Sequence, residues 1–92
     1  MLFEWDEKKN KANKKKHGIA FEDAVFVFQD PFILESFDRN HSTWSEDRWR
    51  AVGFAERLLC VVYTERYGNI RIISARVATD EETNEYYQKN HT

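Results

Sequence analysis

The sequence predicts an α+β domain in which helices pack on a mostly antiparallel sheet, with the element order β-α-α-β-β-β-β-α. Three observations lead to this prediction: two helical segments near the N-terminus, four consecutive strand-like segments after them, and a capped helix at the C-terminal end. We expect residues 1–92 to form one domain. The chain is 41% hydrophobic and 15% aromatic, which is enough apolar surface for a compact core.

A short strand and a lysine-rich helix are predicted first. Phe3 to Trp5 alternates apolar and polar residues, as a strand does. Asp6 is a typical N-cap for the helix that follows, and Gly18 stands where a left-handed C-cap is expected. Because this helix has little apolar surface, we expect it to lie against the edge of the sheet.

An amphipathic helix is predicted next, ending at Asp30-Pro31 because the residue before a proline disfavours the helical conformation. Its apolar residues recur at the i, i+3, i+4, i+7 spacing of a core stripe, and we assign them no chemical role: Phe21, Ala24, Val25 and Phe28.

Four strands should follow, at residues 32–37 and 48–54 and then in a hairpin. The segment from Leu58 to Thr64 is apolar on both faces, as a central strand is. The turn signal at residues 67–69 predicts that Leu58–Arg66 and Ile70–Val77 pair antiparallel. Residues 79–82 then form a capping box, with Thr79 as N-cap and Glu82 at the third helical position.

Composition excludes several classes of protein. The single cysteine, Cys60, allows no internal disulfide and no cysteine-based zinc site, and its apolar surroundings favour a buried, inert thiol. No metal-ligand spacing, P-loop or nucleophile elbow occurs, so no cofactor is expected. The N-terminus lacks the order of a signal peptide and no segment is long and apolar enough to span a membrane, so we expect a cytoplasmic protein.

Charge is unevenly distributed along a chain whose net charge is −2. Lys8 to His17 contains six lysines and no acid, whereas Thr79 to Glu85 contains four acids and no base. The pattern indicates either one basic face or a solvated lysine-rich helix. Trp44 and Trp49 flank a charged loop, as core residues or as a surface for a partner.

The last strand carries Arg71 and Arg76, whose planar, forked guanidinium groups suit phosphate oxygens. Regular alternation would place them on opposite faces unless a bulge intervenes, so at least one should lie on the face that helices cover. That arginine should be paired with a carboxylate or directed into a groove. If only one acts in chemistry, we favour Arg71, and Arg76 is then a scaffold or partner residue.

The sequence also offers candidates for acid–base catalysis. Glu65 and Arg66 face Arg71 across the predicted hairpin, near Tyr63, where a base could take the proton of a ribose 2′-hydroxyl while arginines stabilise charge on phosphorus. His17 is a candidate general acid, because the C-terminal end of a helix favours the protonated imidazole. It can equally be a C-terminal capping residue.

The sequence resembles the BrnT toxin family over nearly its whole length. The matching segments are Phe3-Glu4-Trp5-Asp6, Asn13 with Lys16-His17-Gly18, Phe21-Glu22-Asp23-Ala24, Phe28, Asp30-Pro31, Tyr63-Thr64-Glu65-Arg66, Arg71-Ile72-Ile73-Ser74-Ala75-Arg76 and Ala78-Thr79. The resemblance implies a RelE-like fold and a metal-independent endoribonuclease toxin of a type II toxin–antitoxin system. It also implies neutralisation by a BrnA-like ribbon-helix-helix antitoxin, through which alone the complex contacts DNA and represses its own operon.

The site residues implied by the resemblance are a catalytic set and an RNA-positioning set. The first is His17, Glu65, Arg66, Arg71 and Arg76, and the second is Lys14, Lys15 and Lys16. Two features depart from the family pattern: Ala20 stands where a capping serine or threonine is common, and the chain is slightly acidic. The alternative is therefore a non-catalytic partner-binding module, or an inactivated toxin that acts only in the repressor complex.

Overall fold

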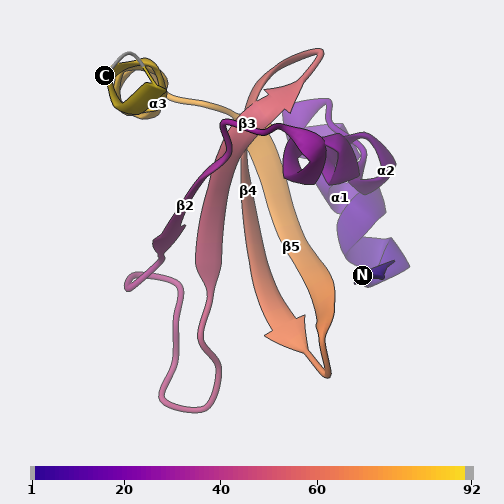
Figure 1. Ribbon diagram of the computed structural model, residues 1–92. Helices are drawn as coiled ribbons and strands as arrows, with labels where there is room; N and C mark the ends of the chain where they lie inside the picture. Colours follow the sequence, from indigo (N-terminus) through magenta and orange to yellow (C-terminus); the bar gives the residue numbers. More distant parts are fainter. Residues whose placement is uncertain (1, 91–92) are drawn as a thin grey trace.

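A five-stranded sheet with the order β1-β5-β4-β3-β2 organises the protein, as the computed structural model of residues 2–90 shows (Figure 1). The elements are β1 (Phe3–Glu4), α1 (Glu7–His17), α2 (Phe21–Ala24), the 3₁₀ helix η1 (Val25–Gln29), β2 (Leu34–Phe37), β3 (Trp49–Ala55), β4 (Arg57–Arg66), β5 (Asn69–Val77) and α3 (Asp80–Asn90). β1 pairs parallel to β5, and the other neighbours are antiparallel. The predicted α+β class is confirmed.

α1 begins and ends as its caps predict. The Asp6 carboxylate accepts from the Lys8 amide at 2.8 Å, and Gly18 adopts the left-handed conformation with φ of 73°. The helix buries two asparagines, Asn10 and Asn13, in place of an apolar stripe. The Asn13 amide group donates to the Ala75 carbonyl at 2.8 Å and accepts from the Ala75 amide at 3.0 Å. α1 therefore lies against the edge of β5, as predicted.

The prediction of one continuous α-helix ending at Asp30-Pro31 is wrong in part. Only α2 is α-helical, and from Val25 onward the chain tightens into the 3₁₀ helix η1. Phe21 and Ala24 are buried as expected, but Val27 is fully buried while Val25 and Phe28 are only partly so. The change from 3.6 to 3.0 residues per turn explains the shift of the buried position.

The sheet has one face that α2 and η1 cover, and a second face that α3 covers at one end and on which Cys60, Val62 and Thr64 of the central strand are still buried. On the covered face, α2 and η1 pack against alternate residues of the central strands, including Ala51, Val61 and Ile72. On the opposite face, Tyr86 of α3 packs at one end with Cys60. We call this second surface the open face; α3 reaches it at the end of an extended linker after β5 and stands apart from the other helices (Figure 1).

A β-bulge in β5, the exception to regular alternation that the sequence left open, places Arg71 and Arg76 on the same face. Across β4 the register runs Val62 to Ser74 and then Tyr63 to Ile72, which leaves Ile73 as an extra residue. The extra residue reverses the alternation, because residues on the two sides of a bulge are out of phase. Arg71 therefore pairs with Thr64 and Arg76 with Cys60, both on the open face.

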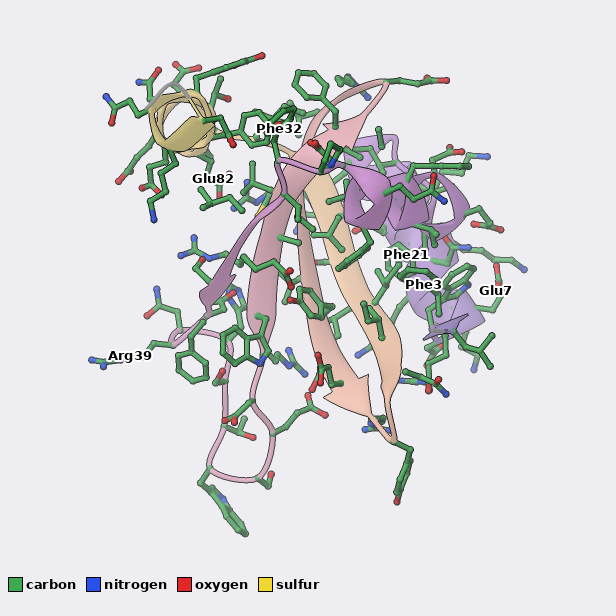
Figure 2. The ribbon with its side chains drawn as sticks, viewed as in Figure 1. Phe3, Glu7, Phe21, Phe32, Arg39 and Glu82 are labelled. Carbon is green, nitrogen blue, oxygen red and sulfur yellow. The ribbon has the colours of Figure 1, made fainter. Side chains whose placement is uncertain are left out.

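α3 begins with the predicted capping box. The Glu82 amide donates to the Thr79 hydroxyl at 3.1 Å, and the Thr79 amide donates to the Glu82 carboxylate at 2.9 Å. This local prediction is confirmed, and it places Glu82 on the side of α3 that faces the strands (Figure 2).

Candidate active site

Arg71 lies at the edge of the open face, where β5 meets β1. Its guanidinium donates to the Glu4 carboxylate at 2.8 Å, because the parallel register places these two residues side by side. The side chains of Arg71 and Glu4 remain 29% and 36% exposed. The ion pair is therefore within reach of solvent and of an approaching anion.

Arg76 forms a two-point ion pair with Glu82. Its two terminal nitrogens donate to the two carboxylate oxygens at 2.7 and 3.0 Å, a planar arrangement that arginine favours. Arg50 of β3 approaches the same carboxylate at 3.6 Å. Within residues 2–90, the Arg50 Nε is the one buried side-chain polar atom without a hydrogen-bond partner. Two arginines thus converge on one carboxylate.

The pKa values of this cluster follow from burial and charge. Burial disfavours the charged form of Glu82, but the hydrogen bonds from Arg76 and the Thr79 amide outweigh it and lower the pKa of Glu82 to about 2. The same carboxylate raises the pKa of Arg76. Cys60 lies beneath them and burial raises its thiol pKa to about 12, so the predicted buried, inert thiol agrees with the structure.

A polar hollow of about 260 Å³ opens beside this cluster. Ser36, Arg50 and Arg76 line it from the strands, and acidic residues line it from α3. Cross-strand pairing explains the convergence, because Ser36 and Arg50 lie in one row across the sheet and Arg76 lies in the next row on the same face.

His17 lies at the β5 edge of the open face. It ends α1 and lines a shallow hollow with Lys16 and Ser74. Ser74 belongs to the open face, between Arg71 and Arg76 along β5. The structure therefore brings His17 to the border of the arginine-bearing surface. Lys14, Lys15 and Lys16 are exposed in the last turn of the same helix.

The expected grouping of Tyr63, Glu65 and Arg66 around Arg71 is not assembled. Tyr63 points to the helix-covered face and its hydroxyl donates to the Glu35 carboxylate. Glu65 is exposed and pairs with Ile70 of the covered face. Arg66 is on the side of Arg71 but donates to Glu46 at 3.3 Å. The sheet thus separates the tyrosine and the glutamate from the arginines.

Sequence reasoning missed Arg50 and the second role of Glu82. Glu82 was identified only as a capping residue, although its carboxylate also binds Arg76. Arg50 lies in a weakly alternating segment, and only its pairing with Ser36 and Val62 reveals its face. The exposed Trp44, at 99%, is a surface residue and not part of the core.

Comparisons with known proteins complete the description of the site. A family profile described as ribonuclease toxin, BrnT, of type II toxin–antitoxin system matches residues 5–82. The chain belongs to the BrnT family.

The fold agrees with that assignment. The crystal structure of the Brucella abortus ribonuclease toxin BrnT superposes with a TM-score of 0.62 at 23% identity, covering 87% of this chain and all of the Brucella chain. No curated protein sequence matches. Within residues 2–90, no helix is long and apolar enough to cross a membrane, and no cluster of three or more histidine, cysteine or acidic side chains could hold a metal ion. BrnT proteins are ribonuclease toxins of type II toxin–antitoxin systems, so this chain belongs to a family of RNA-cleaving toxins with antitoxin partners.

Proposed function

We propose that this BrnT-family chain is itself an active endoribonuclease that needs no metal ion and cleaves RNA on the open face of its sheet. The observation that carries the proposal is the gathering of Arg50, Arg71 and Arg76 on one sheet face in a member of a ribonuclease-toxin family. Permanently charged guanidinium groups are suited to bind RNA phosphates and to stabilise charge that develops on phosphorus.

In the proposed reaction, the ribose 2′-oxygen attacks the adjacent phosphorus while its proton passes to a base. The bond from phosphorus to the 5′-oxygen breaks, and an acid protonates that leaving oxygen. Arg71 stabilises the pentacoordinate phosphorus after exchanging Glu4 for phosphate, since their ion pair is partly exposed to solvent. We assign the role of general acid to His17, which lies at the border of the same face.

The other predicted residues have supporting roles in this proposal. Lys14, Lys15 and Lys16 contact the RNA backbone beyond the reacting phosphate, from the exposed side of α1. Glu65 and Arg66 lie at the hairpin end of the sheet, where they border the RNA path. Arg76 helps to bind phosphate, together with Arg50, which the sequence had not indicated.

A cleavage assay on the purified protein tests the proposal. Arg71→Ala should lower the cleavage rate by about 10²- to 10³-fold, the usual loss for removing one group that stabilises the transition state. Arg39→Ala, an exposed arginine in the loop after β2, is the matched control and should leave the rate unchanged. EDTA should have no effect. If the wild-type chain cuts no RNA, the enzyme proposal is wrong.

We further propose a cytoplasmic toxin that a BrnA-like ribbon-helix-helix antitoxin neutralises, with the complex repressing its own operon. The family description as a type II toxin–antitoxin component supports a protein antitoxin. Expression of the chain alone should arrest growth, and co-expression of the neighbouring antitoxin gene should restore it. Growth arrest that Arg71→Ala leaves undiminished would contradict the assigned role of Arg71.

One observation favours a second candidate, a non-catalytic partner-binding module. Arg50, Arg71 and Arg76 all face a glutamate within 4 Å, so the arginines also fit a scaffold of ion pairs. A chain of this kind would still form the repressor complex with its antitoxin but would cut no RNA, with or without the antitoxin.

A further inference from the structure

We propose that Arg50 and Arg76 form a phosphate-binding subsite for RNA, and that Glu82 of α3 occupies this subsite in the free protein. α3 would then be a detachable acidic plug, because RNA can enter the subsite only when the Glu82 carboxylate leaves it. The inference rests on the proposed RNA-binding function and assigns it a second phosphate position, away from Arg71.

The geometry of the cluster is that of an anion site. The Glu82 carboxylate accepts two hydrogen bonds from Arg76 at 2.7 and 3.0 Å, the fork that arginine presents equally to phosphate. Arg50 is 3.6 Å from the same carboxylate and its buried Nε has no partner. A carboxylate has two oxygens and one charge, so it leaves part of the donor capacity of two arginines unused. A phosphate with its larger number of oxygen acceptors would use more of that capacity.

The distribution of charge supports a plug. Residues 80–92 contain Asp80, Glu81, Glu82, Glu85 and Lys89, a net charge of −3 in a chain of net charge −2. Residues 1–79 are therefore slightly basic, at +1. Glu81, Glu82 and Glu85 all line the hollow beside the arginines. With α3 in place, the hollow is acidic and repels RNA; without α3, its only charged lining residues are the two arginines.

The attachment of α3 suits a segment that can move away. Two residues outside any helix or strand, Ala78 and Thr79, join it to β5, and Figure 2 shows Glu82 reaching from the helix toward the strands. Beyond the Glu82 contacts, α3 is held by Tyr86 and Asn90. The buried Tyr86 ring packs with Cys60 and Phe54, its hydroxyl donates to Asp30 at 2.6 Å, and the Asn90 amide group donates to the Phe32 carbonyl at 3.3 Å. The matched family profile ends at residue 82, whereas α3 continues to Asn90.

Binding of an RNA that cannot be cleaved tests the inference apart from catalysis. The probe is a short, fully 2′-O-methylated RNA, and its dissociation constant is measured by fluorescence anisotropy over a series of salt concentrations. Glu82→Gln removes the competing charge but keeps the capping box, because glutamine also serves at that helical position. It should tighten binding roughly threefold to tenfold and steepen the salt dependence by about one phosphate contact.

Two variants serve as controls. Asp80→Asn removes the same charge from the same turn of α3, but Asp80 does not line the hollow, so binding should stay near the wild-type value. Arg50→Gln added to Glu82→Gln should abolish the gain. An equal gain for Asp80→Asn, or a gain that persists without Arg50, would overturn the subsite.

A measurement on the wild-type chain covers the case in which Glu82→Gln does not fold. Amide hydrogen exchange in α3 should become faster when the 2′-O-methylated RNA binds, because the plug is released. If the α3 amides stay protected in the RNA complex, the proposal that α3 is released on RNA binding is wrong. If the wild type cleaves RNA but Glu82→Gln does not change binding, this inference is wrong and the enzyme proposal is kept. If Glu82→Gln tightens binding but the wild type cleaves no RNA, the enzyme proposal is wrong and the subsite is kept.

Discussion

The side chain of Asn13 forms the backbone hydrogen bonds that a neighbouring strand would otherwise form. Its amide group donates to the Ile19 carbonyl and bonds both backbone groups of Ala75, so it continues the ladder of β5 where β1 has ended. Backbone groups at the edge of a sheet need partners when they are buried, and α1 supplies them through this residue. The polar character of α1 is thus compatible with tight docking.

Replacing Asn13 should destabilise the fold more than any exposed change in α1. Asn13→Ala leaves the buried amide and carbonyl of Ala75 without partners, and we expect unfolding to become easier by about 2 to 4 kcal/mol. Lys11→Ala, an exposed position in the same helix, is the control and should change stability little. Urea denaturation followed by circular dichroism measures both. Equal stabilities of the two variants would contradict the assigned role.

The ion pair of Glu82 predicts how stability depends on acid. The folded protein holds the Glu82 pKa at about 2, below its ordinary value of 4.5. A lowered pKa means that folding favours the charged form, so the stabilisation is complete above about pH 4.5 and is lost as the pH falls toward 2. The loss in that window should be smaller in Glu82→Gln than in the wild type, as urea denaturation at a series of pH values can measure. If the free energy of unfolding falls equally with pH in both proteins, the Glu82 ion pair does not contribute to acid sensitivity.

At the scale of elements, the bulge in β5 decides which face carries Arg71 and Arg76. If Ile73 were paired in regular alternation, Arg76 and Ala75 would exchange faces, and a guanidinium would enter the core beneath α2 and η1. A buried, unpaired arginine is far more costly than an irregular ladder. Burial of the apolar residues on both sides of the bulge therefore selects the irregular pairing.

Deleting Ile73 tests this argument. The shortened strand can pair in regular alternation, with Ile72 and Ala75 on the covered face and Arg71 and Arg76 on the open face, so we expect the cooperative fold to be kept. Deleting both Ile73 and Ser74 instead puts Arg71 or Arg76 on the covered face and should destabilise the protein by more than about 3 kcal/mol. Thermal unfolding distinguishes them, and a double-deletion variant as stable as the single deletion would refute the explanation.

A glycine allows η1 to approach β3. A Cβ atom added at Gly53 would lie 3.0 Å from both the Cγ1 and the carbonyl oxygen of Val27. Backbone cannot move away as a side-chain end can, so Gly53→Ala should destabilise the protein by about 1 to 3 kcal/mol. Gly68→Ala is a comparison in open space, where only the positive φ of 81° opposes the change. Chemical denaturation should show the larger loss at Gly53 if close packing is the dominant cost.

At the scale of the whole molecule, the balance of charge limits what the chain binds alone. Its net charge is −2, and five arginines lie within 4 Å of a carboxylate: Arg48, Arg50, Arg66, Arg71 and Arg76. Paired arginines contribute less to phosphate binding than free ones, because each must first release its carboxylate. The contribution of these arginines to any nucleic-acid affinity therefore depends on how easily the ion pairs open.

This balance predicts that the chain, without a partner, does not bind the operator DNA of the proposed repressor complex. In an electrophoretic mobility-shift assay at physiological salt, the toxin alone should leave the operator unshifted, and the complex with the antitoxin should shift it. A scrambled DNA duplex of the same length controls for non-specific binding. A specific shift by the toxin alone would contradict the proposal that DNA contact is made only through the antitoxin.

Local chemistry explains which parts of this structure the sequence could predict. The caps at Asp6 and Gly18 and the capping box at Thr79 each depend on neighbouring residues, and the hairpin depends on its own turn. The resemblance to BrnT toxins, carried by residues along the whole chain, agrees with the family profile.

The sequence by itself thus determined the α+β class, the order of the elements and the family. Tertiary structure decided the rest: the tightening of η1, the bulge at Ile73, and the meeting of Arg50 with Glu82. Each depends on contacts between segments distant in the chain, because burial of one face sets the register of another strand. That is why Arg71 and Arg76 share one face of the folded protein, although regular alternation would have placed them on opposite faces.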